Sequence, residues 1–116
     1  MLQITPHHKI LLAIAPIDFR KGIDSLVAVC KKYFVCDPMN GTVFVFTNRR
    51  RISVKLLVYD GNGFWLCQKR FSSGKLKWWP ATQEQALHLQ VSELHVILAQ
   101  GIPTQIKIPK NWHEIT

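Results

Sequence analysis

The sequence predicts an α+β fold, in which a mainly antiparallel sheet of four to five strands packs against one N-terminal helix, with a short C-terminal helix. Apolar runs of strand length recur along the chain, apolar residues at helical spacing separate the first two runs, and the turn sequence Asp-Gly-Asn-Gly joins the next two. With 116 residues, 47% of them hydrophobic and 19% charged, we expect one globular domain over residues 1–116. Its core would cover about residues 9–102, followed by an irregular tail at 103–116.

The first two strands and the helix between them are predicted as follows. Residues 9–15 are apolar and end at a proline, which is typical of a short buried strand. Asp18 could cap the helix, because its carboxylate can accept the free amide hydrogens of the first turn. After turn residues at 37–41, the uninterrupted apolar run at 43–46 indicates a strand buried on both faces. The helix would bury one stripe, formed by Phe19, Ile23, Leu26, Val27, Cys30 and Phe34.

A β-hairpin is predicted from strands at 52–59 and 64–71. A two-residue turn pairs Tyr59 with Phe64, and the register continues to Ser53 opposite Arg70. Alternation then gives a core face formed by Ile52, Val54, Leu56, Val58, Trp65, Cys67, Lys69 and Phe71. The second face is mixed and contains Ser53, Lys55, Leu57, Tyr59, Phe64, Leu66, Gln68 and Arg70. A slip of one residue would bury Lys55 and Arg70, so we expect burial to fix this register.

The chain after the hairpin allows two interpretations. A short strand is possible at 75–79, and residues 83–91 alternate like a strand while also carrying helical spacing. One alternative is a long helix with a capping box formed by Thr82 and Gln85. The other, which we favour, is a shorter helix capped by Ser92 that ends at Gln100, with Gly101 as its stop.

The composition restricts the possible partners. Fifteen Lys and Arg residues against seven Asp and Glu residues give a net charge of +8, which favours phosphate backbones or anionic surfaces. Three cysteines without a CxxC pair predict neither a disulfide framework nor a zinc site, and we expect a cytoplasmic protein. No apolar run reaches the roughly 20 residues that span a bilayer. The residues point to no metal and no cofactor.

The candidate binding site centres on an arginine triplet at 49–51, between two predicted strands. Three guanidiniums repel one another unless an anion neutralises them, so nucleic acid is the expected partner. Cations would contact phosphates, and aromatic rings could stack on unpaired bases or simply stabilise the hairpin as a cross-strand pair. The predicted nucleic-acid-binding residues are Arg49, Arg50, Arg51, Lys55, Arg70, Tyr59 and Phe64. Arg20 and Lys21 are second-choice phosphate contacts.

Two other classes of function compete with nucleic-acid binding as interpretations of the sequence. Tryptophan is enriched at interface hot spots, so Trp78 and Trp79, with Trp112 in the tail, could anchor a protein partner. Catalysis is not expected. Two-metal phosphoryl transfer needs carboxylates gathered around the ions, whereas Asp18 has a capping role and Asp37 and Asp60 lie in predicted turns.

From Pro16 onward the sequence resembles a family of mobile-element proteins. The segment 16–26 reads PIDFRKGIDSL and resembles the P-x-D-x-R-K-G-x-D-x-L opening of the short TnpB-type accessory proteins of the bacterial insertion-sequence family numbered sixty-six. The likeness continues in order through Asn48 and the arginine triplet, the 60–65 turn and the pair Trp79-Pro80, and covers roughly residues 10–102. It does not extend to the unrelated RNA-guided nuclease of the same name.

The resemblance implies a non-catalytic accessory role in transposition, with transposon-end DNA and the separate, larger transposase of the element as partners. The alternative it leaves open is an adaptor that docks on the transposase without binding DNA itself. Whether the ligand is DNA, RNA or only protein is not decided by the residues, and neither is the oligomeric state. The tail after Ile102 does not match the family pattern.

Overall fold

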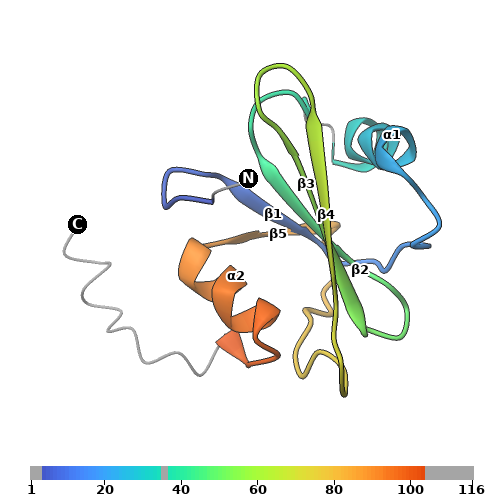
Figure 1. Cartoon of the computed structure of the whole chain (residues 1–116), viewed down its shortest axis with the longest axis vertical. Coiled ribbons are helices and arrows are strands. Elements are labelled where there is room, and N and C mark those ends of the chain that lie inside the picture. The colour runs from blue at the N-terminus through green and yellow to red at the C-terminus, as the bar shows by residue number, and fades with distance from the viewer. Residues whose placement is uncertain (1–3, 35–36, 104–116) are drawn as a thin grey trace.

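The computed structural model describes residues 4–34 and 37–103, which form a five-stranded sheet with one helix on each side (Figure 1). The strand order is β4-β3-β2-β1-β5. Helix α1 covers one face, and α2 covers the other together with a segment that carries Phe71, Leu76 and Trp79. The elements are β1 (Ile10–Ala13), α1 (Ile23–Tyr33), β2 (Val43–Thr47), β3 (Ser53–Tyr59), β4 (Phe64–Arg70), β5 (Ala86–Leu89) and α2 (Val91–Leu98).

Strand β2 is the centre of the sheet, and all five of its residues are buried, as its uninterrupted apolar run predicted. It pairs parallel with β1 and antiparallel with β3, because α1 carries the chain across the sheet between β1 and β2. The pairs β1–β5 and β3–β4 are also antiparallel. The predicted α+β fold with a mainly antiparallel sheet is therefore confirmed.

Helix α1 begins later than predicted. Its N-cap is Gly22, and no side chain caps it. The prediction that Asp18 caps this helix is wrong, because its carboxylate accepts a hydrogen bond from the backbone N–H of Arg20 at 2.9 Å in a preceding turn. Leu26 and Cys30 of the predicted stripe are fully buried against the sheet. Phe19 lies outside the helix but packs against the same cluster.

The β3–β4 hairpin has the predicted register, with Ser53 opposite Arg70 and Tyr59 opposite Phe64. The predicted alternation is confirmed, since Val54, Leu56 and Val58 pack in the cluster under α2 and Leu57 packs in the cluster under α1, but the prediction that the second face is a mixed surface is wrong. Both faces of β3 are buried, because α1 and the segment before it cover the side that carries Lys55. On β4, at the sheet edge, Trp65 of the supposed core face is 40% exposed.

The C-terminal part contains the favoured shorter helix and not the long helix capped by Thr82 and Gln85. Residues 86–89 form β5, and the short helix α2 follows directly. The helix is capped at Gln90 and not at Ser92, and the carboxylate of Glu93 accepts a hydrogen bond from the Gln90 N–H at 2.9 Å. Its stop lies one residue earlier than predicted, because Gln100 takes the left-handed conformation with φ 62°.

The segment 75–79 is not a strand, although it was predicted as a possible one. It crosses the face covered by α2 and buries Leu76 and Trp79 in the core. None of the helices in the described part of the chain is long and apolar enough to span a bilayer. Of the predicted tail at 103–116, residues 104–116, which include Trp112, lie outside the described residues.

Candidate nucleic-acid interface

The arginine triplet lies on the loop between β2 and β3, and Asn48 fixes the shape of that loop. The Asn48 carbonyl oxygen accepts a hydrogen bond from the Arg51 N–H at 3.0 Å, and its side-chain Oδ1 accepts one from the Ile52 N–H at 3.0 Å. Arg49 and Arg50 are exposed at the tip, and Arg51 is half-buried. The loop is therefore a short, internally bonded turn that presents its guanidiniums to water.

No carboxylate within residues 4–34 and 37–103 neutralises the triplet. The ion pair found in this part of the chain joins Arg20 to Asp18, with 2.7 Å between the Arg20 Nη2 and the Asp18 Oδ2. The side chains of Arg49, Arg50 and Arg51 form no hydrogen bond or ion pair with the described residues. Three positive charges thus stay unpaired on one exposed loop, as the sequence interpretation required.

A groove of about 900 Å³ lies beside the loop, between residues 16–20 and residues 48–50. Arg20 stands on the far wall with 92% of its side chain exposed. Hydrogen bonds from the Arg20 side chain and backbone lower the pKa of Asp18 to about 2. Asp18 is therefore anionic at neutral pH and offsets the charge of Arg20. Lys21, the other second-choice contact, is exposed next to this wall.

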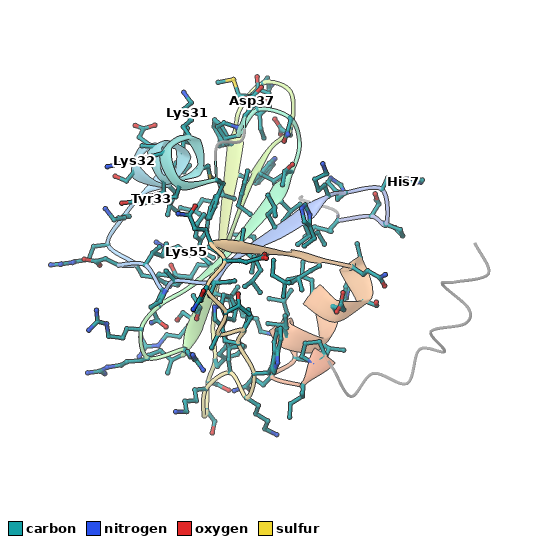
Figure 2. The ribbon with its side chains drawn as sticks, turned by 180° about the vertical axis from the view of Figure 1, so that it is seen from behind. His7, Lys31, Lys32, Tyr33, Asp37 and Lys55 are labelled. Carbon is teal, nitrogen blue, oxygen red and sulfur yellow. The ribbon has the colours of Figure 1, made fainter. Side chains whose placement is uncertain are left out.

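Lys55 does not lie on the hairpin surface, so its predicted position is wrong. It is 5% exposed, and its ammonium donates hydrogen bonds to the carbonyl oxygens of Phe19 at 2.7 Å and Lys21 at 3.0 Å. The ammonium also lies 4.8 Å from the centroid of the Phe19 ring. In Figure 2 the labelled Lys55 lies within the fold, whereas Lys31 and Lys32 project from α1. Its function in the fold is to hold the groove wall on the sheet.

Two lysines that the sequence interpretation missed lie beside the triplet. The Leu76 N–H donates to the Arg51 carbonyl oxygen at 2.8 Å, which joins the segment 75–77 to the arginine loop. Leu76 is buried, while Lys75 and Lys77 on either side of it are exposed. The alternation of Lys, Leu and Lys was visible in the sequence, but its position next to the arginines depends on this long-range hydrogen bond.

Arg70 joins the same end of the molecule, because it is exposed and pairs across the hairpin with Ser53, two residues after Arg51. We call this end of the molecule the cationic end and define it by six residues: Arg49, Arg50, Arg51, Arg70, Lys75 and Lys77. Among the described carboxylates, Asp18 is the one that lines the adjoining groove.

The two predicted stacking rings lie away from the cationic end. Tyr59 and Phe64 are at the opposite end of the hairpin, six residues or about 20 Å along the strand from Ser53. Their centroids are 5.1 Å apart, and both side chains are half-buried. Phe64 also packs against the cluster under α1. The structure does not bring these rings together with the arginines.

Trp78 and Trp79, the two predicted partner contacts, differ in burial. Trp79 is 6% exposed, and its indole N–H donates to the Ile14 carbonyl oxygen at 3.0 Å, so it is a core residue and not a surface anchor. Trp78 is half-buried against the same cluster. The most exposed tryptophan of the described chain is Trp65. Within the described residues, no three His, Cys, Asp or Glu side chains are placed to hold a metal ion.

Comparison with known proteins gives one family. The family described as "IS66 Orf2 like protein" matches residues 8–107. Two proteins of Sinorhizobium fredii, both named as uncharacterized, are similar to this chain over 99 residues: y4jC at 33% identity and y4hO at 27%. The aligned region covers 85% of this chain in both cases, and 84% and 85% of the two relatives. No solved structure matches significantly.

Proposed function

This chain belongs to the IS66 Orf2-like family, whose members are accessory proteins of transposition, and we propose that it serves this role by binding the phosphate backbone of DNA at its cationic end. The observation that carries the proposal is the convergence of three segments, the 49–51 loop, the end of β4 and the 75–77 segment, on one exposed surface. Six cations there have no ion pair with a described carboxylate. The protein supplies no chemical step in this proposal.

The contact we propose involves phosphates and not bases. Lys and Arg side chains on an exposed loop hold backbone phosphates without reading sequence. Exposed aromatic rings would be needed to stack on unpaired bases, and Tyr59 and Phe64 lie at the far end of the hairpin. Binding should therefore depend strongly on salt and weakly on DNA sequence.

A salt titration of DNA affinity tests the proposal. The affinity for element-end and scrambled duplexes is measured over a range of salt concentrations for the parent chain and for a variant with Arg49, Arg50 and Arg51 replaced by alanine. Since each phosphate contact contributes about 0.9 to the slope of log affinity against log salt, the slope should become shallower by about two to three. The matched control replaces Lys9, Lys31 and Lys32, three exposed cations outside the cationic end, by alanine.

The control removes the same total charge, but from outside the cationic end, so the slope of this variant should stay close to that of the parent. An equally shallow slope in the two triple variants would mean that net charge, and not the cationic end, governs binding. Absence of any DNA binding by the parent would favour the alternative, an adaptor that docks on the transposase. Co-purification of this chain with the transposase of its element then becomes the deciding measurement.

A further inference from the structure

Strand β4 leaves apolar side chains partly open to water at the edge of the sheet. Six of the seven residues of β3 are buried, whereas no residue of β4 is. Residues 64–67 (Phe, Trp, Leu and Cys) are all apolar, and Trp65 is 40% exposed. The Trp65 indole N–H donates to the Asp60 Oδ2 at 2.7 Å, which holds the ring at the edge. Edge strands with exposed apolar residues are sites where another strand can pair.

The outer backbone groups of β4 can be assigned from the hairpin register. The Asp60 N–H donates to the Gly63 carbonyl and the Phe71 N–H donates to the Ile52 carbonyl, so these two pairs are hydrogen-bonded pairs of the ladder. Hydrogen-bonded and non-hydrogen-bonded pairs alternate in an antiparallel ladder. The N–H and C=O groups that point away from β3 are therefore those of Phe64, Leu66, Gln68 and Arg70.

The charges along this edge are ordered so that the edge complements itself. The carboxylate of Asp60 lies at the hairpin tip, and Lys69 and Arg70 lie at the other end of β4. Hydrogen bonds from Asn62 and Trp65 lower the pKa of Asp60, so it is anionic at neutral pH. Two such edges in antiparallel orientation bring each tip carboxylate near the cations of the other copy. Parallel orientation would place like charges together.

We propose that β4 is the interface of a symmetric homodimer, in which the β4 strands of two copies pair antiparallel and join their sheets. A two-fold axis through Leu66 gives the most favourable register, because Leu66 then faces itself in the other copy. In this register Trp65 lies opposite Cys67 and Lys69 lies opposite Gly63, so no cation faces a cation. Arg70 is then diagonal to Asp60, within reach of a long side chain. A two-fold interface of this kind uses the same patch on both copies.

The test uses a proline that blocks the outer edge without breaking the hairpin. Gln68 is exposed, and its N–H points away from β3, so Gln68→Pro removes a dimer hydrogen bond but no hydrogen bond of the β3–β4 ladder. Sedimentation velocity of the full chain at moderate salt should show a mass rising from 13.4 kDa to twice that value as concentration increases. Gln68→Pro should remain at 13.4 kDa with native circular dichroism. The control Gln68→Ala keeps the N–H and should dimerise like the parent.

A second variant keeps the test decisive if the proline variant does not fold. Trp65→Lys places a cation opposite Cys67 and beside Lys69 of the other copy, and Trp65 lies at the surface, so the variant should fold and stay monomeric. A parent chain that remains monomeric at all concentrations would overturn the proposal. Dimerisation of folded Gln68→Pro or Trp65→Lys with the affinity of the parent would overturn it as well, since the interface would then lie elsewhere.

Discussion

The ammonium of Lys55 donates a hydrogen bond of 2.7 Å to the carbonyl oxygen of Phe19, in the loop that forms one wall of the groove between residues 16–20 and 48–50. A buried cation here satisfies two backbone carbonyls that would otherwise face an apolar cluster. The groove wall that carries Arg20 thus depends on a residue that does not reach the surface.

Replacing Lys55 by methionine should destabilise the protein by about 1–3 kcal/mol, because the Phe19 and Lys21 carbonyl oxygens lose their donor while remaining partly buried. Equilibrium urea unfolding measures this difference in the free energy of unfolding. The control is Lys21→Met, whose side chain is exposed and whose effect should stay within about 0.5 kcal/mol. Equal stability of Lys55→Met and the parent would show that the two hydrogen bonds do not stabilise the loop.

Alkaline pH should stabilise the parent relative to Lys55→Met. Burial lowers the pKa of Lys55 from 10.5 in the folded state, although the charge of Asp18 raises it in part. Between the folded pKa and 10.5 the unfolded chain binds more protons, so the free energy of unfolding gains a contribution that rises with pH and levels off above 10.5. Urea unfolding of both proteins over this pH range isolates that contribution. A difference that is independent of pH would rule out a buried ammonium.

Acid should remove the contribution of the Asp18–Arg20 ion pair to the stability of the fold. The pKa of Asp18 is lowered from 3.8 to about 2 by hydrogen bonds from Arg20, so its stabilisation is fully present above 3.8 and is lost as pH falls through about 2. Asp18→Asn should therefore be less stable than the parent at neutral pH, and the two proteins should become equally stable as the pH approaches 2. Thermal unfolding of both proteins against pH checks this, and a constant difference down to pH 2 would contradict it.

Arg51→Gly should make the protein more stable and a weaker DNA binder. Arg51 has φ 59°, a left-handed conformation that is unfavourable for a side chain and free for glycine. We expect a gain of about 0.5–1 kcal/mol in the free energy of unfolding. Because one cation is lost, the salt slope of DNA affinity should become shallower by about 0.9. Arg50→Gly, at the tip of the same loop, should make the salt slope shallower by the same amount without the gain in stability.

The features of the fold that depend on local pattern were predictable. The apolar run of β2 and the turn at Asp60 gave the central strand and the hairpin register correctly. The helix start was predicted too early, because Asp18 bonds to its own turn and not to the helix, and such a choice depends on a side-chain partner two residues away.

The composition of the site was less predictable, because it depends on tertiary contacts. Alternation placed Lys55 on a mixed face, but another part of the chain covers that face and supplies carbonyl acceptors. Lys75 and Lys77 were not assigned to the site, since the hydrogen bond between Leu76 and Arg51 joins residues 25 positions apart in the sequence. The resemblance to a family indicated a role in transposition. It did not indicate which cations lie together, because that depends on the fold.

The central claim is that one surface, assembled from the arginine loop, β4 and the 75–77 segment, holds the DNA backbone. The most direct test is the double variant Lys75→Ala, Lys77→Ala, compared with the charge-matched double variant Lys31→Ala, Lys32→Ala in a salt titration of duplex DNA affinity. The slope of log affinity against log salt should become shallower by about 1.8 for the first variant and stay unchanged for the second. An unchanged slope for the first variant, or equal losses for both, would contradict the claim.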